Sequence, residues 1–385
     1  MLLLKILFRN AFRHKLRTIL TILGMTIAIL AFGILRTVVD AWYAGVEASQ
    51  ANRLITRNAI SLTFSLPISY AEKIRQTEGV EKVSWGNWFG AYYKEEKNFF
   101  ANMAVDPKSH LEIVDELILD PAEKSEYFKD RRGAIAGRKL AERFGWKIGD
   151  IITLKGTIYP GDWDFVLKGI YMGRDETVDE SIFLFHWDYF NERMKVQNPM
   201  EADQAGFYII EIERPEMAAA VSGRIDAIFK NSLAETLTET ERAFQLSFVS
   251  MTEAIMMAIQ LVSVVVIAII MAVSANTMAM SVRERLAEYA TMRTLGFGAG
   301  TVFLLIFGES AVITFTGALA GVALTFPAAG LFRSELGQFF PIFIVKATTI
   351  WLDLGAALVV SLVSAVVPAF RAATAPINSA LRRAV

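Results

Sequence analysis

The ionisable residues that stand out in this chain lie in one short segment and inside a predicted membrane helix. Four charges of the segment fall on one side of a short predicted helix: Glu284, Arg285, Glu288 and Arg293. Glu284 and Glu288 are one helical turn apart. Glu309 lies in the inner part of a predicted membrane helix at 300–332, where ionisable residues are rare and are functional by default. Charges so placed can form ion pairs or dock onto a partner, and a solvated loop helix is the alternative for the segment.

Other groups of chemically active residues carry weaker signals. One acidic group could suggest calcium, which prefers clustered oxygen atoms: Asp175, Glu176, Asp179 and Glu180. Its spacing is not that of an EF-hand loop, so a solvated acidic loop is favoured. The three histidines lie far apart in sequence and form no zinc pair: His14, His110 and His186. The chain has no cysteine, which excludes disulfides, thiolate nucleophiles and cysteine-based metal sites.

Composition argues against several other functions. The net charge of −1 gives no basic excess, which argues against a nucleic-acid partner. The glycine-rich run at 296–300 has no following lysine, and no G-x-x-x-x-G-K-[ST] phosphate loop occurs in the sequence. No nucleophile elbow or catalytic dyad is found either. We therefore expect no catalytic residues, no metal site and no cofactor on this chain.

Four apolar runs define the expected architecture: Thr18–Leu35, Ala254–Val282, Ser310–Phe332 and Leu354–Phe370. A helix needs about 20 apolar residues to cross a bilayer. We predict a membrane α-helical protein with four transmembrane helices at 18–39, 254–280, 300–332 and 353–370. A large extracytoplasmic α+β domain at 40–253, with stalk helices near the membrane, separates the first two.

Basic residues predict the orientation. The acid-free segment 1–17, the connection 281–299 and the tail 371–385 carry the arginine and lysine bias that marks the cytoplasmic side. Both termini are expected in the cytoplasm of a cell inner membrane, with 333–352 as a short outer loop. Segment 1–17 has the pattern of an interfacial helix, or it is a basic topology signal alone.

Local patterns predict further elements. Residues 138–144 are expected to form a helix closed by Gly145, and 150–155 with 164–171 a pair of strands about a turn. Residues 91–105 suggest a hairpin and 40–60 a continued helix. From 233 to 253 the chain lacks helix breakers, which predicts one long helix running into the second span. Gly317 and Gly321 have the small-x-x-x-small spacing of close helix contacts.

The segment NTMAMSVRERLAEYATMRTLGFG at 276–298 resembles the MacB/FtsX-type ABC transporter permeases, including their N-x-M-x-x-S-V-x-E-R-x-x-E pattern. The tail at 364–382 is similar to the family's closing P-A-x-R-A-x…P…A-L-R, and 10–27 to its opening. Looser matches at 79–84 and 136–150 are similar to its periplasmic domain. The run at 289–294 departs from the family's usual I-G-I-x-R-A-L-G, which leaves the subfamily open.

The resemblance implies a permease subunit with two copies of a separate ABC ATPase, which would bind ATP and Mg²⁺. It also implies a second permease copy, as a homodimer or a heterodimer. The segment would couple the two proteins through Arg283, Glu284, Arg285, Glu288, Met292, Arg293, Leu295 and Gly296. Glu309 is expected to pair with a basic residue near the inner face, in preference to handling substrate or protons.

Two functions fit this plan. The first is mechanical transmission of ATP-driven movement to the outer domain, for export through a periplasmic adaptor or for extraction of a lipid or lipoprotein. The alternative is an FtsX-like signal transducer that activates a cell-wall hydrolase. The sequence does not identify the substrate.

Overall fold

The computed structural model describes residues 11–336, 340 and 342–374. The chain divides into two compact units, with boundaries between Ala41 and Trp42 and between Thr252 and Glu253. One unit contains the long apolar helices, and the other contains an α+β domain built from the residues between these boundaries.

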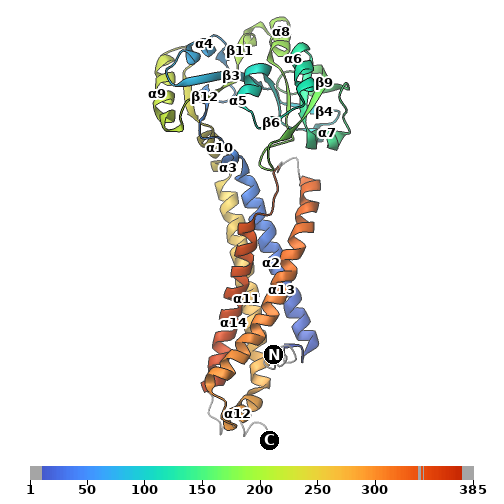
Figure 1. Cartoon of the computed structure of the whole chain (residues 1–385), viewed down its shortest axis with the longest axis vertical. Coiled ribbons are helices and arrows are strands. Elements are labelled where there is room, and N and C mark those ends of the chain that lie inside the picture. The colour runs from blue at the N-terminus through green and yellow to red at the C-terminus, as the bar shows by residue number, and fades with distance from the viewer. Residues whose placement is uncertain (1–10, 337–339, 341, 375–385) are drawn as a thin grey trace. The chain divides into compact units, whose positions relative to one another are not determined.

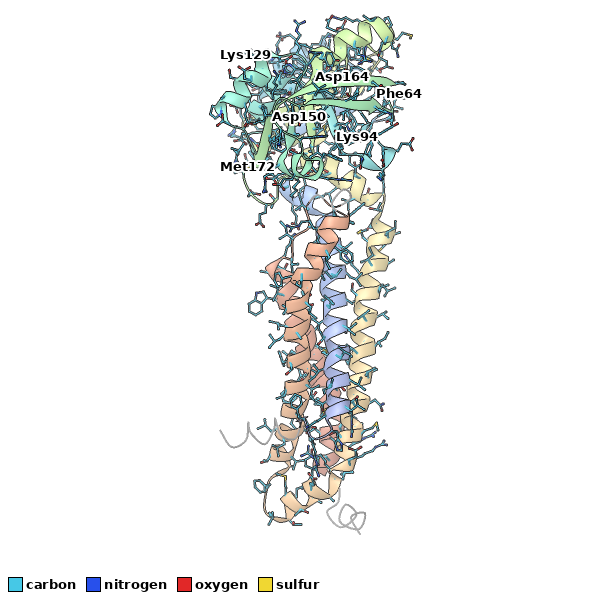
Figure 2. The ribbon with its side chains drawn as sticks, turned by 90° about the vertical axis from the view of Figure 1, so that its right-hand side faces the viewer. Phe64, Lys94, Lys129, Asp150, Asp164 and Met172 are labelled. Atoms are coloured by element: carbon cyan, nitrogen blue, oxygen red, sulfur yellow. The ribbon has the colours of Figure 1, made fainter. Side chains whose placement is uncertain are left out.

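The long helices lie side by side in Figure 1 and in the turned view of Figure 2. They are α2 (Lys15–Trp42), α11 (Glu253–Glu284), α13 (Ala299–Leu336) and α14 (Ala347–Thr374). In the described chain, four helices are long and apolar enough to cross a membrane. At 1.5 Å per residue, α11 is about 48 Å long, against roughly 30 Å of hydrocarbon. The prediction of four membrane helices, with an α+β domain between the first and second, is confirmed.

Small residues let α13 approach α2 closely. A Cβ atom at Gly317 would lie 2.6 Å from Met25 Cβ, and one at Gly321 would lie 2.8 Å from Ile29 Cβ. The Thr26 hydroxyl also donates to the carbonyl oxygen of Gly317 at 3.2 Å. The contact that the glycine spacing predicts is therefore present, and it leaves no room for a side chain at either glycine.

A mixed β-sheet forms the centre of the α+β domain. Its spatial order is β13-β1-β12-β3-β5-β10-β7-β9-β8-β4, with β6 paired to β9. The strands are β1 (Arg53–Asn58), β3 (Val80–Trp88), β4 (Ala91–Tyr93), β5 (Asn102–Val105), β6 (Leu117–Ile118), β7 (Gly133–Gly137), β8 (Ile151–Gly156), β9 (Gly161–Gly173), β10 (Phe183–His186), β12 (Phe207–Ile212) and β13 (Thr236–Thr240). A separate antiparallel pair joins β2 (Leu66–Pro67) to β11 (Gln204–Ala205). Strands β5–β10 and β7–β9 pair in parallel.

Strands β1, β3, β12 and β13 form one half of the domain with helices α4 (Tyr70–Arg75) and α9 (Ala218–Ile228). In chain order they make a β-α-β-β-α-β arrangement. Apolar residues from both helices and three strands form its core, among them Leu54, Ile74, Val83, Ile210, Val221 and Ile225. The other half is inserted between β3 and β12.

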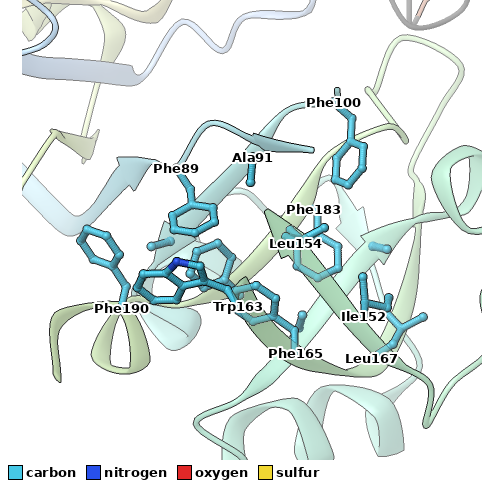
Figure 3. Packing of buried hydrophobic residues seen from close by; sticks show 14 of the residues in the cluster. Phe89, Ala91, Phe100, Ile152, Leu154, Trp163, Phe165, Leu167, Phe183 and Phe190 are labelled. Carbon is cyan, nitrogen blue, oxygen red and sulfur yellow. The ribbon is translucent and has the colours of Figure 1, made fainter. Parts of the chain in front are cut away.

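The inserted half has an aromatic core, shown in Figure 3. The ring of Phe89 lies edge-on to that of Trp163, with 4.9 Å between the ring centroids, and the ring centroids of Phe165 and Phe185 are 4.4 Å apart. The helices of this half are α5 (Pro107–Ile113), α6 (Pro121–Lys129), α7 (Arg138–Phe144) and α8 (Trp187–Gln197). Helix α7 ends at Gly145, whose φ of 67° suits glycine. The predicted helix and the β8–β9 strand pair are thus confirmed.

Three local predictions are wrong because strand pairing outweighs local pattern. Residues Arg53–Asn58 and Thr236–Thr240 form β1 and β13, which pair with each other, instead of helices. Threonine favours strands, and Thr56 hydrogen-bonds Thr238 at 2.9 Å. The expected long helix is therefore limited to α10 (Glu241–Ser250), followed by a turn at 251–252 before α11. The expected 91–105 hairpin is reduced to an isolated antiparallel bridge between Tyr92 and Phe99, since β4 pairs with β8 and β5 with β3 and β10.

Short helices complete the described chain: α3 (Ala44–Ala48), α12 (Leu286–Thr294), and the 3-10 turns η1 (Glu96–Asn98), η2 (Pro199–Glu201) and η3 (Pro215–Met217). The interfacial helix expected at 1–17 falls largely on residues 1–10, outside the described chain.

Candidate functional site

The charged segment does not form one helix. Helix α11 ends at Glu284, and Arg285 has non-helical backbone angles of φ −109° and ψ 10°. Helix α12 then begins, and the chain turns at Gly296, whose φ is 93°. The prediction that Glu284, Arg285, Glu288 and Arg293 share one helical face is therefore wrong, because the break at Arg285 redirects the chain.

Arg285 faces the helix bundle. Its Nη1 lies 2.7 Å from Glu309 Oε2, and both side chains are less than a tenth exposed. Ser281 donates a hydrogen bond to the other oxygen of Glu309 at 3.1 Å. The Arg285 guanidinium also lies 5.2 Å from the centre of the Tyr289 ring. Glu309 thus has a basic partner, and Arg285 is not available to a docking protein.

The two glutamates of the segment pair with residues at and just before the start of α2. Arg17 donates to Glu284 at 2.7 Å, and His14 Nε2 lies 3.3 Å from the same carboxylate. Glu288 pairs with Arg13 and with Arg285. Partial burial opposes ionisation of Glu288, but the hydrogen bonds from these two arginines outweigh it and lower its pKa. The contact of Glu284 thus joins the end of α11 to α2, and that of Glu288 joins α12 to Arg13, just before α2.

The remaining predicted residues divide into a packed group and an exposed group. Met292 is half-buried against an apolar cluster that includes Tyr289, and Arg293 is also half-buried. Leu295 is 73% exposed and Phe297 is 48% exposed. Arg283 and Gly296 are exposed as well. Within residues 281–298, the exposed large apolar side chains therefore lie in the turn after α12, which we call the 295–298 turn.

The acidic loop of the α+β domain is stabilised by local contacts. Glu180 is buried, pairs with Arg138 at 2.9 Å and accepts from the Gly173 amide at 2.9 Å. Asp179 accepts hydrogen bonds from the amide and hydroxyl of Ser181, and burial raises its pKa. Within the described residues, no group of three histidine, aspartate or glutamate side chains could hold a metal ion.

The histidines occupy separate environments. His14 lies beside Glu284, His186 Nε2 is 2.7 Å from the carbonyl oxygen of Tyr127, and His110 is buried. Burial, followed by the charge of Arg53, lowers the pKa of His110 to about 3.

Sequence reasoning missed a second polar group in the bundle. Asp353 and Asp40 are buried, and Arg36 Nη2 lies 3.2 Å from Asp40 Oδ1. The available signal was acidic residues at the edges of apolar runs: Asp40 lies just after the first, and Asp353 directly precedes the last.

Known proteins resemble both parts of the chain. Residues 18–228, more than half of the chain, match the MacB-like periplasmic core domain, and residues 260–377 match the FtsX-like permease C-terminal domain. No curated protein matches the chain.

Three solved structures are similar to part of it. The extracellular domain of the noncanonic ABC-type transporter YknZ from Gram-positive bacteria is 14% identical, with a TM-score of 0.36, and covers 49% of this chain and 100% of that chain. The periplasmic region of MacB from Actinobacillus actinomycetemcomitans is 7% identical, with a TM-score of 0.37. The match covers 53% of this chain and 95% of the MacB region. A domain of a putative permease protein from Porphyromonas gingivalis is 13% identical, with a TM-score of 0.33. The match covers 49% of this chain and 90% of that domain.

The permease family consists of multi-pass membrane proteins, typically non-catalytic transporter subunits that act with an ATPase. With its apolar helices and both matched domains, the chain belongs to the FtsX/MacB-like ABC transporter permeases.

Proposed function

We propose that this permease transmits the ATP-driven movement of a separate ATPase to its α+β domain by mechanical means. The observation that carries the proposal is α11, which runs without a break from Glu253 to Glu284. One end of this helix follows the α+β domain in sequence, and the other leads into α12. A rigid helix can pass a small shift from one end to the other, whereas a flexible loop would absorb it.

The α+β domain holds the two chain segments that connect it to the membrane helices. The indole of Trp42, the last residue of α2, donates to Thr252 just before α11 at 2.8 Å. Glu241, the first residue of α10, lies 3.2 Å from the buried Arg53 of β1 and accepts from the Gln50 amide at 2.8 Å. Movement of either segment would therefore be transmitted to the sheet through these contacts.

The 295–298 turn is the ATPase-docking surface in this proposal. Leu295 and Phe297 supply exposed apolar contacts, and Arg283 supplies charge. Glu284, Arg285 and Glu288 have a different role. Glu284 joins the end of α11 to α2, while Arg285 and Glu288 fix α12 to the bundle, so that a push on the turn would move α11 and α2 together.

The assembly proposed from the family has two permease copies and two ATPase copies, with ATP and Mg²⁺ on the ATPase. Both termini and the 295–298 turn would face the cytoplasm of an inner membrane.

Two cavities within the described bundle have volumes of about 10 and 20 Å³, which is room for single water molecules. Four spans per copy leave little room for a substrate passage, which favours export, or extraction of a lipid or lipoprotein, by the outer domain.

The test is the double variant Leu295→Asp/Phe297→Asp, with Leu233→Asp as the matched control at a fully exposed leucine of the α+β domain. The double variant should lose ATPase binding and stimulation while keeping the helix content of the wild type. The control should keep both functions. Normal ATPase binding and stimulation by the double variant would refute the docking assignment.

A further inference from the structure

Asp353 of α14 is a buried carboxyl group without a partner inside the helix bundle. The residue is 1% exposed, and its Oδ1 is buried without a hydrogen-bond partner among the described residues. It packs on α2 where that helix has a glycine: a Cβ atom at Gly33 would lie 3.1 Å from Asp353 Oδ2 and 3.0 Å from Thr325 Oγ1. The Thr325 hydroxyl donates to Gly321 O at 3.0 Å, so its proton is already used.

The cation on the facing helix pairs with another carboxylate. Arg36 of α2 lies 3.2 Å from Asp40, and Thr349, one turn before Asp353, donates to Asp40 at 3.4 Å. Residues 254–282 of α11 and 310–332 of α13 contain no ionisable side chain.

The charged residues at the ends of these helices are also placed elsewhere. Arg333 donates to the carbonyl oxygen of Phe343 at 2.6 Å, and Glu253 is exposed at the start of α11. Lys346 immediately precedes α14. None of these three residues forms an ion pair with Asp353.

An unpaired carboxylate in a membrane helix bundle carries a large desolvation cost, whereas a neutral carboxylic acid avoids most of it. A bound metal ion would need about six oxygen ligands. Here the oxygen atoms that face Gly33 come from one carboxyl group, that of Asp353, and one hydroxyl group, that of Thr325. A proton needs neither room nor further ligands. Arg36, Asp40 and Asp353 would together be neutral with one proton bound.

We propose that Asp353 is a proton-binding site. Its carboxyl group carries the proton while α14 is packed on α2 at Gly33. When that contact opens, the O–H bond breaks, the proton passes to water, and the carboxylate left behind becomes hydrated. Separation of the two helices is thereby linked to proton release.

The test is infrared difference spectroscopy on the full-length chain in lipid nanodiscs. At pH 7 the wild type should show a protonated carboxyl band that is absent from Asp353→Asn and retained in Glu253→Gln, the control at an exposed carboxyl group that leaves the Arg36–Asp40 pair intact. Exchanging Na⁺ for K⁺ should leave the band unchanged. Identical bands in the wild type and Asp353→Asn, or loss of the band in Na⁺, would overturn the proposal.

A second variant keeps the test informative if Asp353→Asn folds poorly. Gly33→Ala leaves the carboxyl group in place but pushes α2 away from it. It should shift the pH at which the band disappears to a lower value, because water reaches the group more easily. An unchanged midpoint would also count against the proposal.

Discussion

Replacement of Arg285 by methionine should destabilise the bundle far more than the same change at Arg283. Arg285 and Glu309 form an ion pair in which both side chains are less than a tenth exposed, whereas Arg283 is exposed. Removing one partner of a buried pair costs about 3–5 kcal/mol, because the other charge stays buried without compensation. The change at Arg283 should cost no more than about 0.5 kcal/mol.

A double-mutant cycle isolates the pair. Arg285→Met/Glu309→Leu should recover most of the loss, since well-packed apolar residues often replace a buried pair at little cost. The assay is unfolding of the full-length chain in mixed micelles by increasing denaturing detergent, followed by circular dichroism. If Arg285→Met costs no more than Arg283→Met, the buried pair does not stabilise the bundle and the reasoning fails.

Two further outcomes follow from packing and burial. Gly317→Ala should destabilise the bundle by about 1–3 kcal/mol in the same assay, because its Cβ would meet Met25 Cβ at 2.6 Å; Gly330→Ala, with nothing within 4 Å, should be neutral or slightly stabilising, and equal effects would contradict the close contact. The pKa of His110 falls from 6.5 to about 3 on folding, so the unfolded chain binds more protons than the folded chain between these values. The contribution of neutral His110 to the free energy of unfolding is therefore complete above pH 6.5 and is lost as the pH falls towards 3. At pH 5 the loss should be about 2 kcal/mol, measured by denaturant unfolding with tryptophan fluorescence, and His110→Leu should remove it while His14→Leu should not; equal pH dependence in the wild type and His110→Leu would contradict the assignment.

The architecture could be predicted because its signals are local. Apolar runs long enough to span a bilayer identify membrane helices without knowledge of their neighbours, and Gly145 marks a helix end by its own conformational freedom. Pairing between distant segments has no such signal. Thr236–Thr240 has no helix breaker, and only its pairing with β1, some 180 residues earlier, makes it a strand.

The same limit explains the errors at the candidate site. Periodicity placed Arg285 on an exposed helical face, but its ion pair with Glu309, 24 residues later, turns it inward and coincides with the helix break. A charge reversal at Arg285 would therefore disturb the fold, so it does not test docking. Asp353 was missed because nothing near it in sequence shows that α2 carries a glycine at the facing position.

The most direct test of the account measures movement of the α+β domain. The chain has no cysteine, so Leu233→Cys, at a fully exposed position, accepts one spin label per copy. In the reconstituted complex, the distance between labels on the two copies should change when a non-hydrolysable ATP analogue binds. Insertion of several glycines after Met257 in α11 should abolish this change while ATP hydrolysis persists, because each glycine weakens the helix by about 1 kcal/mol and interrupts its stiffness. The same distance change in the insertion variant would contradict mechanical transmission through α11.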